Sequence, residues 1–151
     1  MDKNVLLNRF VQSLKSNNFN NLAFRKLMNF SFEKEEVCDM IVYLESTYSN
    51  QIRCSVFELL VKSGLNAVEL FEKYFSSELN TSAPGKIMDL ATEIESPELI
   101  LSIYSKYPSL STAALMKLKK MKKYDSMAPF LFSEDLSLAN LANQILSKSE
   151  N

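Results

Sequence analysis

Apolar residues recur along most of this chain with the spacing of an α-helix. Within each segment they return after three or four positions, which places them on one side of a helix. No segment alternates apolar and polar residues for long, as a half-buried strand would. Hydrophobic residues make up 46% of the 151 positions, which is enough for a buried core. The pattern predicts an all-α protein with about nine helices.

Short polar segments separate the expected helices. Ser96 suits the N-cap of a helix, with Pro97 in its first turn, and Gly64 suits a left-handed residue at a helix end. Further breaks are expected at residues 17–21, 80–86 and 106–111. Because these links are short, neighbouring helices should pack antiparallel.

The helices after the first two form pairs that recur about every 30 residues. The first helices of the pairs are expected to begin near Val37, Val68, Leu99 and Met127. An aromatic residue lies late in each of them, at Tyr43, Tyr74, Tyr104 and Phe132. The second helices are expected within residues 51–63, 83–94, 111–121 and 136–146. Hairpins in series at a near-constant period are typical of an α-solenoid.

With these hairpins, residues 36–149 resemble the HEAT-like family of helical repeats. The resemblance rests on the period and on small residues followed by spaced leucines in "TAALMKLKKM". The chain departs from the family in its short repeats; the usual proline of the first helix occurs only at Pro129, and the usual Asp and Arg are suggested only at Arg53. The resemblance implies a right-handed α-solenoid of about four antiparallel hairpins, with residues 1–32 as an N-terminal hairpin or cap and residues 1–151 as a single domain. An irregular helical bundle is the alternative, and it belongs to the same all-α class.

The composition excludes much chemistry. Histidine is absent, which removes Ser-His and Cys-His nucleophile pairs and histidine-containing zinc sites. Two glycines cannot form a glycine-rich phosphate loop. Cys38 and Cys54 lie in apolar stretches and are interpreted as reduced core thiols, with a disulfide or a reactive thiol as alternatives. We therefore expect no enzyme, no metal and no cofactor.

A lysine-rich run, "KLKKMKKY" from Lys117 to Tyr124, is the most conspicuous motif. On a helical wheel its apolar residues share one side, so the run is expected to be the exposed part and the end of an amphipathic helix. A solvated helix face is one interpretation, and a nucleic-acid contact is the other. The candidate basic patch consists of Lys117, Lys119, Lys120, Lys122 and Lys123.

Charge is distributed unevenly, although the net charge is only −1. Residues 33–98 hold thirteen acidic and five basic residues, whereas the segments on both sides carry a basic excess. In a solenoid this order would place an acidic band between basic flanks. Acidic residues on the expected second helices, Glu58, Asp89 and Glu93, are the candidate partner-binding residues.

These observations favour a non-catalytic protein-binding module. A small, slightly acidic helical protein is similar to the immunity proteins that neutralise bacterial toxin domains, including those of contact-dependent growth inhibition. That resemblance implies a toxin partner, such as a nuclease, with a basic surface. A nucleic-acid-binding repeat and an adaptor or assembly subunit remain the alternatives. The start of the chain lacks the pattern of a signal peptide and no run is long enough for a membrane helix, so we expect a cytoplasmic protein without a membrane partner.

Overall fold

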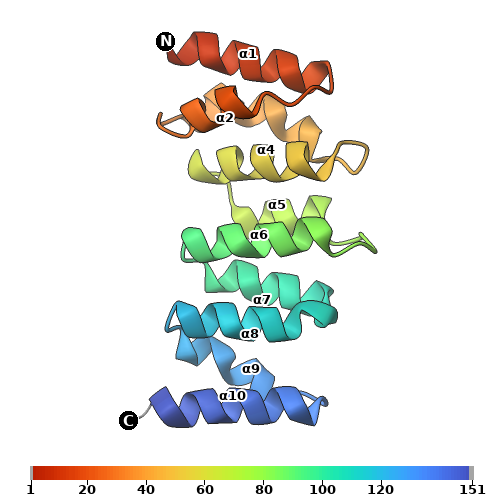
Figure 1. Cartoon of the computed structure of the whole chain (residues 1–151), viewed down its shortest axis with the longest axis vertical. Helices are drawn as coiled ribbons and strands as arrows, with labels where there is room; N and C mark the ends of the chain where they lie inside the picture. Colours follow the sequence, from red (N-terminus) through yellow and green to blue (C-terminus); the bar gives the residue numbers. More distant parts are fainter. Residues whose placement is uncertain (1, 150–151) are drawn as a thin grey trace. The chain divides into compact units, whose positions relative to one another are not determined.

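The computed structural model describes residues 2–149, which form ten α-helices and three 3-10 helices (Figure 1). No strand occurs among these residues, so the all-α prediction is confirmed. The chain divides into two compact units, residues 1–77 and 78–151, named below the N-terminal and C-terminal units. No helix of the described residues has both the length and the apolar character to cross a lipid bilayer.

The N-terminal unit contains five α-helices and one 3-10 helix. They are α1 (Lys3–Lys15), α2 (Asn21–Leu27), α3 (Lys34–Val37), the 3-10 helix η1 (Cys38–Leu44), α4 (Asn50–Lys62) and α5 (Ala67–Tyr74). Helix α1 packs on α2, and α4 packs on η1 and α5. Phe57, Phe71 and Phe75 are fully buried, and the Phe75 ring lies 5.6 Å from that of Phe57, edge to face. Aromatic packing therefore joins α4 to α5.

Arg53 is a buried charged residue in this unit, with 2% of its surface exposed. Its Nε donates to the carbonyl oxygen of Leu44 at 2.8 Å, and Nη2 donates to that of Tyr74 at 2.7 Å. Its guanidinium carbon lies 4.3 Å from the centroid of the Phe75 ring. One side chain of α4 thus donates hydrogen bonds to carbonyl groups at the ends of η1 and α5, which a helix leaves without an internal partner.

The helix expected from Val37 differs from the prediction. The structure has a single α-helical turn at Lys34–Val37, which continues as a 3-10 helix over Cys38–Leu44. Two β-branched residues in a row, Ile41 and Val42, lose side-chain freedom in an α-helix, and this favours the departure. The hydrogen bond from Arg53 Nε to the carbonyl of Leu44 then fixes the end of the segment against α4.

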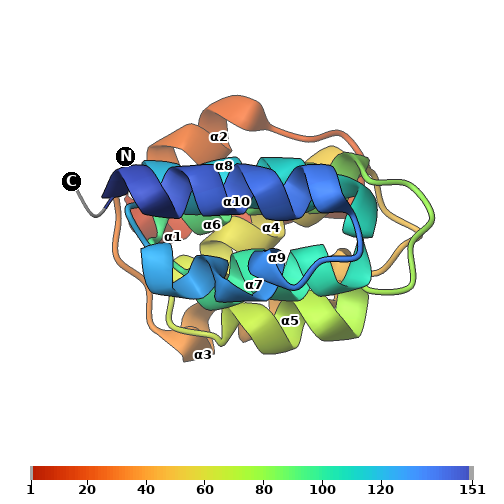
Figure 2. The same ribbon diagram turned by 90° about the horizontal axis from the view of Figure 1, so that it is seen from below.

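The C-terminal unit contains α6 (Ser82–Glu93), α7 (Pro97–Lys106), the 3-10 helix η2 (Pro108–Leu110), α8 (Ser111–Lys120), the 3-10 helix η3 (Tyr124–Met127), α9 (Ala128–Leu131) and α10 (Leu136–Ser149). Helix α8 contacts α6, α7 and α10, and α9 contacts α10. Within this unit α6, α8 and α10 lie on one side and α7 and α9 on the other (Figure 2). Helices α6, α8 and α10 therefore pack beside one another in one layer.

Helix boundaries in this unit follow the polar signals of the sequence. Ser96 is the N-cap of α7, where its side chain accepts a hydrogen bond from the amide of Leu99 at 3.3 Å, and Pro97 follows in the first turn. This confirms the expected start. The late aromatic of the last pair is different: Phe132 is 86% exposed, whereas Phe130 is buried with its ring 4.6 Å from that of Tyr104.

Four helices, α1, α4, α6 and α8, end with the same backbone motif. A residue with positive φ follows each of them: Asn17 (55°), Gly64 (104°), Glu95 (54°) and Lys122 (59°). The amide after it turns back into the helix, as where Lys123 N donates to the carbonyl of Leu118 at 3.0 Å. The motif satisfies two carbonyl groups at each helix end. The sequence analysis predicted it at Gly64 only, because glutamate and lysine ordinarily disfavour this conformation and asparagine tolerates it without specifying it.

Candidate binding surfaces

The lysine-rich run forms the end of α8 and the turn after it. Ala114, Leu115 and Leu118 are fully buried, whereas Lys119 and Lys120 are exposed. Lys122 and Lys123 are also exposed, in the turn that follows α8. The expected amphipathic helix is therefore present, with Lys119 and Lys120 on its exposed side.

Lys117 belongs to the candidate basic patch, but the structure pairs it with a member of the acidic set. Its Nζ lies 2.7 Å from Oδ1 of Asp89, with 30% and 67% of the two side chains exposed. This ion pair joins α8 to α6. Because the two charges offset each other, Lys117 and Asp89 contribute less to the field around the protein than the sequence suggests.

The three acidic candidates lie in different surroundings. Glu58 is half-buried on α4 of the N-terminal unit and pairs with Lys62 one turn later, with Nζ 3.1 Å from Oε1. Asp89 and Glu93 lie one turn apart on α6 of the C-terminal unit, and both are exposed. The structure thus brings two of the three acids together, on α6.

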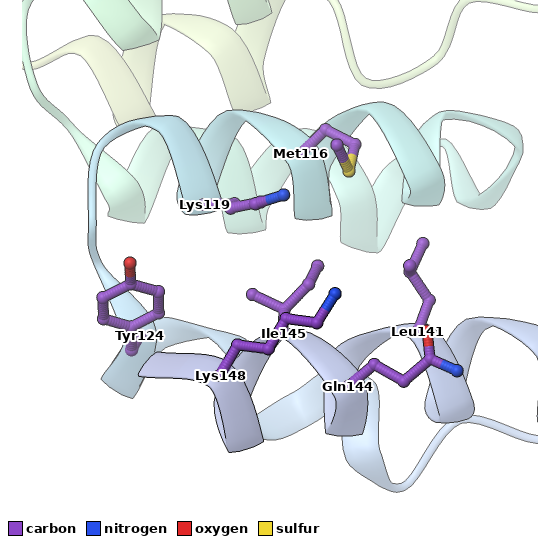
Figure 3. A pocket seen from close by; sticks show the side chains of 7 residues that line it. All are labelled: Met116, Lys119, Tyr124, Leu141, Gln144, Ile145 and Lys148. Carbon is purple, nitrogen blue, oxygen red and sulfur yellow. The ribbon is translucent and has the colours of Figure 1, made fainter. Parts of the chain in front are cut away.

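A groove lies between α8 and α10 in the C-terminal unit (Figure 3). Its volume is about 200 Å³, and it is lined by Met116, Lys119, Tyr124, Leu141, Gln144, Ile145 and Lys148. Met116 and Lys119 come from α8, Tyr124 lies at one end, and the other four residues come from α10 (Figure 3). We name it the α8–α10 groove.

The sequence analysis identified only Lys119 among these groove residues as a candidate. A signal for the others was present, since Leu141, Gln144, Ile145 and Lys148 recur at the spacing of one side of a helix. Which helix that side would meet depends on the packing of α10 on α8, which the periodicity of α10 does not specify.

A second hollow in this unit is apolar. It has a volume of about 430 Å³ and is lined by Leu101, Tyr104, Ser105, Pro108 and Pro129. In the N-terminal unit, a hollow of about 580 Å³ is lined by residues of mixed charge, among them Lys34, Glu69 and Lys73. The first of these hollows has no charged residue in its lining, and the second has charges of both signs.

Neither Cys38 nor Cys54 forms a disulfide, as expected, but the sequence analysis misplaced one of them. Cys54 is half-buried on α4, whereas Cys38 is exposed. Cys38 begins the 3-10 helix rather than a regular α-helix, so the apolar neighbours in its sequence do not place its side chain in the core. Its Sγ donates to the carbonyl of Glu35 at 3.7 Å.

The pKa values of Glu36 and Tyr43 are shifted, and neither residue lines a hollow described above. A hydrogen bond from the amide of Glu33, followed by one from the side chain of Lys3, lowers the pKa of the Glu36 carboxyl. Burial, followed by the nearby Tyr48, raises the pKa of the Tyr43 hydroxyl. Within residues 2–149, no group of three His, Cys, Asp or Glu side chains is placed to hold a metal ion. Both shifted groups belong to structural contacts of the N-terminal unit.

Comparison with models of known families, with curated protein sequences and with solved structures finds no match to this chain.

Proposed function

We propose that this protein is a non-catalytic protein-binding module. The observation that carries the proposal is the α8–α10 groove, where aliphatic side chains form a floor and polar side chains form a rim on two regular helices. Protein interfaces have this composition, with an apolar centre, a polar rim and few acidic residues at the centre. Stable helices also hold the surface in one conformation before a partner arrives, which lowers the entropic cost of binding.

The more specific proposal is an immunity-type inhibitor in the cytoplasm that binds and neutralises a toxin domain such as a nuclease. Its support is the acidic surface of α6, where Asp89 and Glu93 are exposed one turn apart. A nuclease presents basic residues to nucleic acid, so an acidic helix surface would complement it and would accelerate association. The architecture proposed for the chain is a right-handed solenoid of HEAT-like hairpins.

The test begins with affinity capture from the source cell, followed by the association rate of the captured partner at low and high salt. We expect one protein partner, and an association rate that falls as salt rises. Glu93→Lys should lower this rate severalfold at low salt, because it reverses a charge that faces the partner. Glu134→Lys is the matched control, since Glu134 is exposed in the same unit but lies outside α6.

Capture of no protein partner would refute the binding module. Equal rates for Glu93→Lys and Glu134→Lys would refute the role of the acidic surface while leaving protein binding intact. If the captured partner is an assembly component without toxic activity, the adaptor alternative replaces the inhibitor.

Nucleic-acid binding is the second candidate function, and one observation favours it. Lys148 of α10 lies at the same groove as Lys119 of α8, beside Tyr124, so the basic residues extend beyond the lysine-rich run. Lysines around an aromatic ring can hold phosphates while a base stacks on the ring. Fluorescence anisotropy with labelled RNA and DNA at two salt concentrations tests this candidate, and absence of binding at low salt would eliminate it.

A further inference from the structure

The α8–α10 groove combines an aliphatic floor with a positively charged rim. Ile145 is 7% exposed and forms part of the floor, whereas Met116 is 43% exposed and lies at the surface of α8. Lys119 and Lys148 are exposed on the two sides, one from each helix (Figure 3). An occupant that satisfies both features needs an apolar group and a negative charge close to it.

No negative charge of the groove itself meets these lysines. The residues that line it include no carboxylate. Within residues 2–149, Asp89 pairs with Lys117 and no carboxylate pairs with Lys119 or Lys148. Among the described residues, the ammonium groups of Lys119 and Lys148 therefore lie next to an apolar surface with no carboxylate paired to them, and a carboxylate on the occupant would supply one.

The dimensions favour a single side chain over a larger ligand. The groove holds about 200 Å³, which is less than the roughly 300 to 1,000 Å³ of pockets that enclose drug-sized molecules. Its floor is aliphatic, with one aromatic ring at the end, whereas surfaces that bind single-stranded nucleic acid rely on aromatic rings for stacking. Met116 is flexible and polarizable, which suits contact with apolar side chains of differing shape.

We propose that the α8–α10 groove binds an apolar side chain of a partner protein, in a segment whose neighbouring residues are Asp or Glu. The proposal rests on the proposed function and adds the chemistry of the partner at a second surface of the C-terminal unit. The carboxylates of the partner pair with Lys119 and Lys148 while its apolar side chain covers Met116 and Ile145. The partner then carries acidic residues where it meets the groove and basic residues where it meets α6.

The test uses fluorescein-labelled hexapeptides and fluorescence polarisation. The first peptide has Leu-Phe at its centre and two glutamates on each side, the second has lysines in place of the glutamates, and the third has Ala-Ala in place of Leu-Phe. We expect the first to bind with a dissociation constant on the order of 100 µM, and the other two to bind at least about fivefold more weakly.

Two variants locate the binding on the protein. Lys148→Glu reverses a rim charge, and Met116→Glu places a carboxylate on the apolar surface. Each variant should weaken binding of the first peptide at least about fivefold. Both residues are exposed, so neither variant removes a core side chain. Lys86→Glu makes the same charge change at an exposed position of α6 and should alter binding less than about twofold. Circular dichroism confirms that all three variants fold.

Several outcomes would overturn the proposal. These are equal binding of the acidic and lysine peptides, no binding of the acidic peptide, and loss of binding in Lys86→Glu as large as in Lys148→Glu. Binding of a labelled single-stranded oligonucleotide but of no peptide would assign the groove to nucleic acid. Self-association of the protein that Met116→Glu abolishes would assign it to a second copy of the chain.

The captured cellular partner separates this proposal from the proposed function. If the partner binds Lys148→Glu and Met116→Glu as tightly as the unchanged protein but binds Glu93→Lys weakly, the groove proposal fails and the binding module stands. If the acidic peptide binds the groove but no cellular protein is captured, the groove proposal stands and the proposed function fails.

Discussion

Three of the four left-handed helix ends are formed by residues with a side chain. Lys122 has φ 59° at the end of α8, and Glu95 has φ 54° at the end of α6. An L-residue in this region costs roughly 1–2 kcal/mol relative to the right-handed conformation, and only glycine avoids this cost. The backbone motif nevertheless forms, because it satisfies helix carbonyl groups and reverses the chain toward the next helix.

Lys122→Gly should therefore stabilise the protein. We expect the free energy of unfolding to rise by about 1 kcal/mol, because glycine adopts the observed backbone conformation without a steric cost. Thermal and urea unfolding measure the change. Lys122→Ala is the control, since it removes the same charge but keeps the Cβ atom; an equal gain in both variants would attribute the effect to charge instead.

Glu36 gives the folding stability a dependence on pH. Its pKa is lowered in the folded protein, so the ionised carboxylate stabilises the folded state at pH values above the ordinary pKa of about 4.3. That contribution is lost as the pH falls through the folded pKa, because protonation removes the charge that Lys3 and the Glu33 amide bind.

Glu36→Gln should accordingly be less stable than the unchanged protein at pH 7 and should approach it at acidic pH. Urea unfolding at several pH values measures the difference. Glu45→Gln, at another exposed position of the same unit, is the control. A difference for Glu36→Gln that stays constant from pH 7 to acidic pH would contradict the explanation.

At the scale of packed elements, the side chain of Arg53 connects η1, α4 and α5. Arg53 donates to a carbonyl at the end of η1 and to another at the end of α5, and it covers the Phe75 ring. Hydrogen bonds that involve a charged group are worth more than neutral ones, and a carbonyl left buried without a donor costs further free energy.

Arg53→Met should destabilise the protein by about 2–4 kcal/mol, because methionine keeps much of the volume but donates to neither carbonyl. Chemical unfolding gives the value. Arg25→Met replaces an exposed arginine of the same unit and should change stability by less than about 0.5 kcal/mol. Similar losses for the two variants would show that the buried hydrogen bonds contribute little.

Helix type and order could be predicted from the sequence far better than the interactions between helices. The second helices of the pairs, α4, α6, α8 and α10, lie close to their predicted ranges, because each has an amphipathic pattern and a polar boundary. The 3-10 helix η1 was missed, and the hydrogen bond that holds its last carbonyl comes from Arg53 of another helix, which local periodicity cannot specify.

The candidate site shows the same division. The exposure of Lys119 and Lys120 followed from the helical wheel of α8 alone. The pairing of Lys117 with Asp89 depends on the alignment of α8 with α6, and the approach of Lys148 to Lys119 depends on the packing of α10 on α8. Local periodicity predicts neither the ion pair nor the position of Lys148 near Lys119, since each involves residues of two separate helices.

In the whole molecule, the connection between the two units is an exposed, non-helical part of the described backbone. The first unit ends at residue 77 and the second begins at residue 78, between α5 and α6. Leu79 is fully exposed in this connection and lies outside any helix. Exposed, non-helical segments are the preferred sites of limited proteolysis, because a protease must bind its substrate in an extended conformation.

Chymotrypsin at low concentration should therefore cleave after Leu79, as well as after Phe132, which is 86% exposed outside any helix, and mass spectrometry identifies the fragments. Leu79→Ser removes the preferred side chain and should slow cleavage at this position without a change in thermal stability. Initial cleavage within α4 or α8 instead would show that helix opening, rather than exposure of the connection, determines proteolytic sensitivity.

The repeated helix ends also determine which amides resist hydrogen exchange. At each end the residue after the left-handed one donates its amide to a carbonyl within the helix, at Asn18, Leu65, Ser96 and Lys123. These four amides follow the last helical residue, in segments that would ordinarily exchange fast with solvent. They should exchange slowly, together with the amides of helices α1, α4, α6 and α8. Protection from hydrogen exchange should therefore extend past the end of each helix to the residue after the left-handed one.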